Sequence, residues 1–153
     1  MAIEVGDVAP EFELKNQFGE VVKLTDYRGK SNVVLLFYPK AFTGTCTAEL
    51  CAIRDDRADF VTDSTVTLGV SCDSPDTLKA FAESQGYDFN LLSDWWPHGA
   101  TAQAYGVFLE ERGFALRATF IIDKQGVVRW KVVNSPADAR SNSDYRAALA
   151  EIN

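Results

Sequence analysis

The sequence predicts an α/β fold in which a central mixed sheet is flanked by helices on both faces. Three observations support this prediction. Short apolar runs typical of buried strands recur along the chain, stretches with helical spacing lie between them, and a closing pair of strands is joined by a tight turn. Strands that alternate with helices build a largely parallel sheet, and a hairpin adds antiparallel strands to it.

The first expected element is an N-terminal hairpin. Phe12 and Leu14 alternate with polar residues, as do Val22 and Leu24, and Gly19 lies between the two pairs. Alternation with a period of two is the pattern of a strand with one buried face. The sequence therefore predicts two antiparallel strands that turn near Gly19.

The strands that follow are expected to be buried on both faces. Residues 33–38 form a continuous apolar run, and residues 66–71 form a second strand. A third strand covers residues 119–122, and the turn at 123–126 leads into its hairpin partner at 127–132. Continuous apolar runs of this length are typical of central strands.

Helices are expected between these strands. Residues 46–60 carry apolar side chains on one helical face, at Leu50, Ile53 and Phe60. Pro75 is suited to the first turn of a second helix, which Gly86 ends. Residues 100–105 predict a short helix, and Ser143 with the residue after it could cap a last one.

Composition limits the classes of function. A chain of 153 residues with 46% hydrophobic content predicts a single domain over residues 1–153. The formal charge of −7 argues against nucleic acid and anionic membranes as partners. The N-terminus has no basic and apolar leader, and the longest apolar run is far shorter than the roughly 20 residues that span a bilayer. We therefore expect a cytoplasmic protein.

Cysteine and histidine usage excludes several kinds of site. The three cysteines are Cys46, Cys51 and Cys72, and an odd number argues against a framework of structural disulfides. His98 is the single histidine and there is no Cys-x2-Cys pair, so we expect no metal site. No Gly-x-Gly-x-x-Gly motif is present, so we expect no nucleotide cofactor either.

The strongest candidate site lies where the 33–38 strand meets the next helix. Ligands of open α/β sheets bind at such junctions, and Cys46 falls in the first turn of the expected helix. Free backbone N–H groups and the helix dipole favour a negative sulfur there. Thr43 supplies a hydroxyl, and Pro39 lacks a donor and can shield the sulfur from water. These features suit a nucleophile, although a cysteine that simply packs behind the helix fits the residues equally well.

The junction resembles a known family. Pro39-x-x-x-Thr43-x-x-Cys46 matches the Pro-x-x-x-Thr-x-x-Cys signature of the peroxiredoxins, and similar segments extend over essentially the whole chain. The stretch 94–100 most resembles the AhpE-like group of that family. The other segments that carry the resemblance are residues 5–12, 24–30, 91–94, 104–107 and 117–123.

The resemblance implies a thioredoxin-like fold and a thiol-dependent peroxidase. Cys46 would be the nucleophile that attacks the peroxide and becomes a sulfenic acid. Thr43 would hydrogen-bond the peroxide and the sulfur, Pro39 would cover the pocket, and Arg117 would be the cation that stabilises the thiolate and the leaving oxygen. Glu49, one turn after Cys46, is expected either to bridge to an arginine or to be a surface charge at a helix start.

A second cysteine raises the question of how oxidised Cys46 is resolved. Cys51 gives a Cys-x4-Cys spacing, which the Q-like peroxiredoxins use and AhpE-like members usually lack. Five helical residues separate Cα atoms by about 8.6 Å, whereas a disulfide needs roughly 4.4–6.8 Å. Cys51 could therefore resolve Cys46 only after the first turns unwind, and a buried small side chain is the equal alternative. For Cys72 a core position is favoured, with a resolving role still open.

Two alternative functions remain at this stage. A thioredoxin-like disulfide oxidoreductase normally has Cys-x-x-Cys at this helix start, but Glu49 occupies the third position after Cys46. A non-catalytic thioredoxin-fold binding module would have no reason to keep Pro39, Thr43, Cys46 and Arg117 together. For a peroxidase, the expected partners are a peroxide and a thioredoxin-type protein or low-molecular-weight thiol as reductant. A homodimer is also expected from the resemblance.

Overall fold

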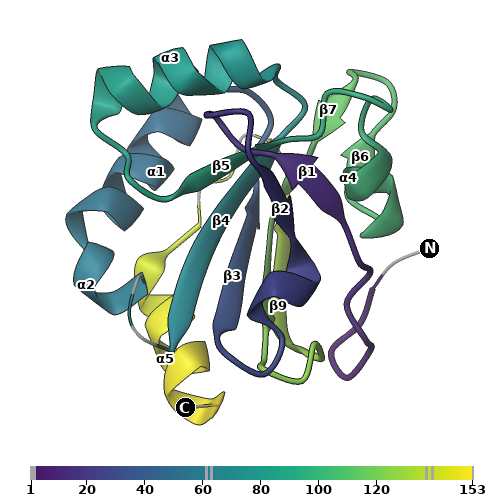
Figure 1. The fold of residues 1–153 in the computed structure, drawn as a ribbon, viewed down its shortest axis with the longest axis vertical. Helices are drawn as coiled ribbons and strands as arrows, with labels where there is room; N and C mark the ends of the chain where they lie inside the picture. The colour runs from purple at the N-terminus through teal and green to yellow at the C-terminus, as the bar shows by residue number, and fades with distance from the viewer. Residues whose placement is uncertain (1–2, 61, 63, 137, 139, 153) are drawn as a thin grey trace.

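A mixed sheet runs through the middle of the molecule (Figure 1). The computed structural model describes residues 3–60, 62, 64–136, 138 and 140–152. In this part of the chain, seven strands join in the order β2-β1-β5-β4-β3-β8-β9. Their bounds are β1 Glu13–Lys15, β2 Val21–Lys23, β3 Asn32–Phe37, β4 Thr65–Ser71, β5 Asn90–Ser93, β8 Arg117–Ile122 and β9 Val128–Asn134.

The strand pairings confirm the predicted mixed sheet. β4 is parallel to both β3 and β5, whereas β8 is antiparallel to β3 and β9 is antiparallel to β8. The N-terminal hairpin pairs β1 with β2, and β1 joins the sheet antiparallel to β5. The register between β3 and β8 sets Phe37 opposite Ala118. The last residue of β3 therefore lies beside the start of β8.

β3 connects the two halves of the hydrophobic core. All six of its residues are buried, because helices and loops cover both faces of the sheet at its centre. Val33, Leu35 and Phe37 contribute to the core on one face, while Val34 and Leu36 contribute to the core on the other. This alternation follows from the period of two of an extended strand, and it explains why residues 33–38 are apolar without a break.

Helices cover both faces of the sheet (Figure 1). On one face lie α1 (Gly44–Asp55), α2 (Arg57–Phe60), α3 (Pro75–Gln85) and α5 (Asn142–Ile152), which share one core cluster. The other face is covered by the short 3-10 helix η1 (Leu24–Tyr27), by α4 (Ala100–Ala104) and by the β6–β7 hairpin (Phe108–Leu109 and Phe114–Ala115). No helix in the described residues is long and apolar enough to cross a membrane.

The prediction of a single helix over residues 46–60 is wrong, because two helices occupy this segment. The helix begins at Gly44 and is interrupted at Asp56, whose φ of −97° and ψ of 23° end α1 before α2 begins. Apolar spacing continues across this break, because Leu50, Ile53 and Phe60 all reach the same core cluster. The periodicity therefore predicted the buried face correctly but could not reveal the interruption.

The α3 boundaries agree with the predicted start and stop signals. The Ser74 hydroxyl accepts a hydrogen bond from the Thr77 backbone N–H, and Pro75 is the first helical residue. Gly86 ends the helix in the left-handed conformation with φ of 70°, which glycine adopts without steric cost. This turn redirects the chain so that Tyr87 points back toward α1, where its hydroxyl meets the Thr47 carbonyl.

The turn before α4 depends on Gly99. The Asp94 carboxylate accepts hydrogen bonds from the backbone N–H groups of Thr101 and Ala102, at 3.0 and 2.9 Å. Gly99 has a φ of 71°, and a Cβ atom built on it would lie 2.2 Å from the ring of Phe108. The position therefore needs glycine both for its backbone conformation and for the close approach of that ring.

Replacing Gly99 with alanine should destabilise the fold more than the same change at Gly19. Gly19 has a similar φ of 78° but open space where the Cβ would lie. Gly19→Ala should therefore cost only the left-handed strain, about 1–2 kcal/mol. Gly99→Ala should add overlap with Phe108, about 1–3 kcal/mol more. Urea unfolding of both variants checks this, and equal losses would contradict the close packing at Gly99.

Candidate active site

Cys46 lies in the first turn of α1, as the sequence predicts. α1 follows β3 after a short loop, and Thr43 is its N-cap, so Cys46 is the third helical residue. The first backbone N–H groups of a helix have no partner within the helix and carry partial positive charge. The side chain of Cys46 is fully buried, with 0% of its surface exposed. A sulfur in this position is held at the positive end of a helix and away from bulk water.

Arg117 reaches Cys46 from the neighbouring strand. It is the first residue of β8, and the antiparallel pairing of β8 with β3 brings it to the end of the sheet where α1 begins. Its NH1 donates to the Cys46 Sγ at 3.1 Å and to the Glu49 Oε1 at 2.8 Å, and its Nε donates to the Pro136 carbonyl at 2.6 Å. The guanidinium is thereby fixed against the sulfur.

Glu49 holds two arginines together. One turn after Cys46 on α1, its carboxylate accepts from Arg117 and also from the Arg140 Nε and NH2, at 2.9 and 2.8 Å. Burial alone would raise the pKa of Glu49, but hydrogen bonds and charge from Arg140, and then the charge of Arg117, outweigh it and lower that pKa. The carboxylate therefore stays ionised at neutral pH, and the reading of Glu49 as a surface charge does not hold.

Arg140 is a site residue that the sequence analysis missed. Its NH1 donates to the carbonyls of Phe37 and Ala118, at 2.6 and 2.7 Å, and its backbone N–H donates to Glu49. These contacts tie the loop before α5 to the adjoining ends of β3 and β8. Nothing in the local sequence marks this arginine, because all of its partners come from distant segments.

The four side chains form a cluster whose charges balance. Glu49 and an ionised Cys46 carry two negative charges, and Arg117 and Arg140 carry two positive charges. If Cys46 were a neutral thiol, the cluster would hold one uncompensated positive charge in a buried place, which is costly. A negative charge on the Cys46 sulfur would therefore be matched within the cluster, and a cysteine reacts as a nucleophile when its sulfur carries that charge.

The loop between β3 and α1 holds Pro39 and Thr43, the two other residues of the predicted motif. Pro39 is buried, and the Thr43 hydroxyl donates to the Lys40 carbonyl at 3.0 Å. In the described structure this hydroxyl makes no hydrogen bond to Cys46. Its oxygen keeps lone pairs that can accept a hydrogen bond from a small ligand.

Two further contacts fix the loop's conformation. The Ala41 N–H donates to the Asp73 Oδ2 at 2.8 Å, which ties the loop to the end of β4. Phe42 has a φ of 66°, a left-handed conformation that is unfavourable for a residue with a side chain. Its half-exposed ring packs on Phe81 of α3, with ring centroids 4.9 Å apart. Strained residues of this kind cluster at functional sites.

The other two cysteines have different surroundings. Cys51 is partly buried on α1, and its Sγ lies 3.3 Å from the Tyr87 hydroxyl and 3.5 Å from the Gln85 Oε1. Cys72 follows β4 and is buried, and burial, together with the charges of Asp94 and Asp73, raises its pKa to about 12. Cys72 is therefore an unionised thiol at neutral pH, in agreement with the favoured core reading.

Within the described residues, no three His, Cys, Asp or Glu side chains are grouped so that they could hold a metal ion. The chemistry that the cluster supports is that of a sulfur nucleophile beside a fixed cation.

A comparison with protein families identifies the chemistry. The model of the AhpC/TSA family matches residues 5–131. This chain belongs to the AhpC/TSA family of peroxiredoxins. Peroxiredoxins are thiol-dependent peroxidases, so the protein is an enzyme of that class.

Two curated peroxiredoxins show the extent of the similarity. Alkyl hydroperoxide reductase E of Mycobacterium tuberculosis is 43% identical over 150 residues, which cover 98% of each chain. Peroxiredoxin Bcp of Bacillus subtilis is 40% identical over 141 residues, which cover 87% of this chain and 88% of the relative. The expected resemblance to AhpE-like members is therefore confirmed.

Solved structures confirm the thioredoxin-like fold. Peroxidoxin BcpB from Mycobacterium tuberculosis superposes with a TM-score of 0.87 at 32% identity, and the match covers 99% of both chains. Reduced 2-Cys peroxiredoxin from Plasmodium vivax superposes with a TM-score of 0.85 at 30% identity, covering 95% of this chain and 80% of that one. The match over nearly the full chain includes both core clusters and the α1 junction.

The carboxylate of Glu49 should stabilise the peroxiredoxin fold in a pH-dependent way. Glu49→Gln removes the charge between two buried arginines, and we expect a loss of about 2–4 kcal/mol in unfolding free energy at pH 7. Because the folded pKa of Glu49 is lowered, its contribution is present above the unfolded value near 4.5 and is lost as pH falls through the folded pKa. The gap between wild type and variant should therefore close at acid pH.

Urea unfolding between pH 3 and pH 8 measures this gap. Glu83→Gln is the matched control, because Glu83 is exposed on α3 and its substitution should change the unfolding free energy by no more than about 0.5 kcal/mol. Equal effects of the two substitutions at pH 7 would contradict the role given to Glu49.

Proposed function

We propose that Cys46 is the nucleophile with which this peroxiredoxin reduces hydrogen peroxide and organic hydroperoxides. The observation that carries the proposal is the 3.1 Å contact between the Arg117 NH1 and the Cys46 Sγ, at the first turn of a helix. Both features stabilise negative charge, first on the sulfur and then on the oxygen that departs.

The reaction is a displacement at oxygen. The thiolate attacks the nearer oxygen of the peroxide, an S–O bond forms and the O–O bond breaks. Cys46 becomes a sulfenic acid, and the departing alkoxide, or hydroxide from hydrogen peroxide, takes up a proton to give an alcohol or water. The charge that leaves the sulfur moves to the departing oxygen, so a guanidinium fixed within reach of both lowers the barrier.

Each neighbour of Cys46 has a distinct role in this proposal. Thr43 accepts a hydrogen bond from the peroxide and orients it, and Pro39 keeps water from the sulfur. Glu49 does not touch the substrate. It is a positioning residue, since its carboxylate fixes the guanidinium of Arg117 and is itself fixed by Arg140.

We further propose that Cys51 resolves the oxidised Cys46. The Cys51 thiolate attacks the sulfenic sulfur, an S–S bond forms, the S–O bond breaks, and the oxygen leaves as water with two protons. The first turns of α1 must unwind for the two sulfurs to meet. The raised pKa of Cys72 supports this choice between the two remaining cysteines, because an unionised thiol is a poor nucleophile.

A thioredoxin-type protein or a low-molecular-weight thiol would then return both cysteines to the reduced state. A cycle that depends on such thiols belongs in a reducing compartment, which supports a cytoplasmic location. We also propose that the protein forms a homodimer. Its support is the apolar surface exposed by Trp95 and Trp96, of which 52% and 80% is accessible.

Substitutions at the site should distinguish the role of Cys46 as nucleophile from the role of Arg117 as cation. Cys46→Ser should abolish peroxide consumption, whereas Cys72→Ser should retain it. Arg117→Met should lower the rate of Cys46 oxidation by about 100- to 1,000-fold, as loss of a donor to a developing oxyanion does. Arg129→Met is the matched control, because Arg129 pairs with Asp123 far along β9 from the site. Stopped-flow oxidation with one equivalent of peroxide gives these rates.

Other outcomes would favour the alternative functions. Reduction of insulin disulfides by the wild type, without peroxide turnover, would indicate a thioredoxin-like disulfide oxidoreductase. Neither activity would indicate a binding module. Peroxide consumption that survives Cys46→Ser would contradict the assignment of Cys46 outright.

A non-reducing peptide map after one equivalent of peroxide should reveal the resolving partner. We expect a peptide pair joined through Cys46 and Cys51, with Cys72 alkylated only after denaturation. Cys51→Ser should instead leave Cys46 as a sulfenic acid that dimedone traps. A stable sulfenic acid in the wild type, with Cys51 free, would mean that an external thiol resolves Cys46.

A further inference from the structure

The hydroxyl of Tyr87 binds α1 at the place where the helix has to open. Tyr87 follows Gly86, the left-handed residue that ends α3. Its hydroxyl donates to the Thr47 carbonyl at 3.2 Å and lies 3.3 Å from the Cys51 Sγ. One side chain from the α3–β5 connection therefore contacts both the first turn of α1 and the second cysteine.

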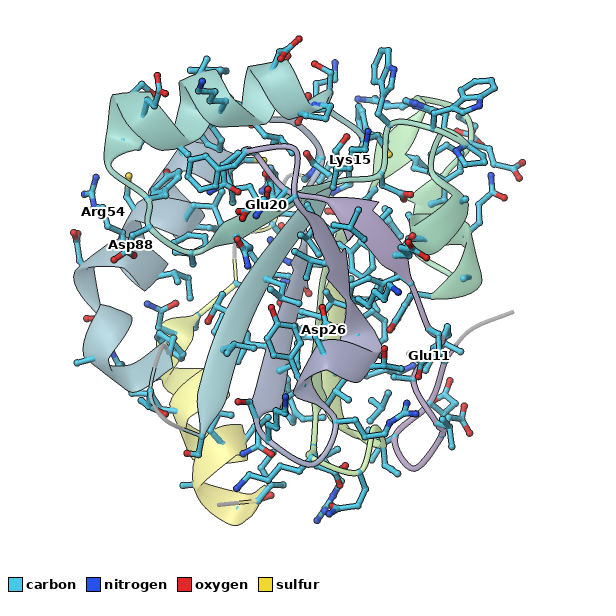
Figure 2. All side chains as sticks on the ribbon, in the orientation of Figure 1. Glu11, Lys15, Glu20, Asp26, Arg54 and Asp88 are labelled. Atoms are coloured by element: carbon cyan, nitrogen blue, oxygen red, sulfur yellow. The ribbon has the colours of Figure 1, made fainter. Side chains whose placement is uncertain are left out.

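Gln85, the last residue of α3, adds two further contacts with α1. The Cys51 thiol donates to the Gln85 Oε1 at 3.5 Å, and the Arg54 NH1 donates to the Gln85 carbonyl at 2.5 Å. Figure 2 shows Arg54 at the edge of the molecule, beside the chain that leads from α3 to β5. Thr47, Cys51 and Arg54 are spaced by four and three residues and so share one face of α1.

The Thr47 carbonyl is the critical acceptor. In an α-helix this carbonyl also accepts the backbone N–H of the residue four positions on, which is Cys51. Unwinding the turn between Cys46 and Cys51 breaks that hydrogen bond. The Tyr87 hydroxyl is bound to the same oxygen, so it stabilises the closed form of the turn that disulfide formation must open.

The Tyr87 ring is well fixed in this position. It is buried, and it packs edge-to-face on Phe81 and in a stack with Phe89, with centroids 5.2 and 5.3 Å away. Burial, and then the neighbouring Cys51, raise the pKa of Tyr87, so the hydroxyl keeps its proton at neutral pH and remains a donor. The loss of this hydroxyl would leave the ring packing in place.

We propose that Tyr87 is a latch that sets the rate at which Cys51 resolves oxidised Cys46. Its hydroxyl must leave the Thr47 carbonyl and the Cys51 thiol before the two sulfurs can meet. A slower release gives a second peroxide more time to convert the sulfenic acid to a sulfinic acid, with an alcohol or water as the other product. The proposal rests on the resolving role of Cys51 proposed above.

Tyr87→Phe tests the latch, with Tyr105→Phe as its control. Tyr105 is also a buried tyrosine, but its hydroxyl donates to the Pro10 carbonyl in the core on the opposite face of the sheet. The measurement is a single turnover with one equivalent of hydrogen peroxide, quenched by acid, alkylated and analysed by mass spectrometry. It follows the sulfenic acid and the Cys46–Cys51 disulfide separately in time.

The latch predicts a change in the second step alone. Disulfide formation should be about three- to ten-fold faster in Tyr87→Phe, as expected for the loss of one hydrogen bond that holds the closed state. The rate of sulfenic acid formation should be unchanged, and Tyr105→Phe should match the wild type in both steps. With excess peroxide, Tyr87→Phe should accumulate less sulfinic acid than the wild type.

Amide hydrogen exchange of the reduced protein gives an independent readout. The Cys51 amide should exchange faster in Tyr87→Phe, while amides in β3 should keep their protection. If Tyr87→Phe does not fold, Gln85→Leu serves in its place, since at a partly exposed position it removes the contact with the Cys51 thiol and otherwise only a 3.5 Å contact with the exposed Ser84 hydroxyl. It should accelerate disulfide formation about two-fold.

The possible results distinguish failure of the Tyr87 latch from failure of the proposal that Cys51 resolves Cys46. A wild type that consumes peroxide but forms no Cys46–Cys51 disulfide would overturn both the resolving role of Cys51 and the latch. A disulfide that forms at the same rate in wild type and Tyr87→Phe would overturn the latch alone. A slower rate in Tyr87→Phe would show that the hydroxyl assists resolution, which also overturns it.

Discussion

The contact of one guanidinium with both Cys46 and Glu49 is the interaction on which the active site depends. Arg117 can make it only because β8 runs antiparallel beside β3, so that its first residue lies at the start of α1. Glu49 then needs a second donor to balance the buried charge, and Arg140 supplies it. Glu49 and the two arginines therefore stabilise one another, and removal of the Glu49 carboxylate leaves two buried guanidinium groups without their shared anion.

Most strands and helices could be predicted from local sequence patterns, and there are physical reasons why the remaining strands could not. The β3 run and the α3 signals, Pro75 and Gly86, are strong because each depends on neighbouring residues. β5 was not predicted as a strand, since its conformation depends on partners elsewhere in the chain: its four residues pair with β4, and Ser93 also pairs with Lys15 of β1. The two-residue strands of the β6–β7 hairpin carry no periodicity at all.

A site residue could be predicted from the sequence only where neighbouring residues carry the signal for it. Cys46 could be selected from the strand–helix junction, whereas Arg117 without the family motif is only a charge before a strand. Arg140 lies 91 residues from Glu49 in sequence, and no spacing rule connects them. The same holds for Cys51: its distance from Cys46 could be worked out on an ideal helix, but the Tyr87 that contacts it lies 36 residues away.

The complete burial of Cys46 has a consequence for which molecules the enzyme can meet. A nucleophile at the surface would be open to every electrophile in its surroundings, in proportion to their abundance. Because no part of the Cys46 side chain is exposed, a molecule must enter the interior at the start of α1 before a bond to the sulfur can form. In the function proposed above, a small oxidant meets this requirement more readily than a bulky thiol-reactive compound, so the fold favours reactants by size rather than by abundance.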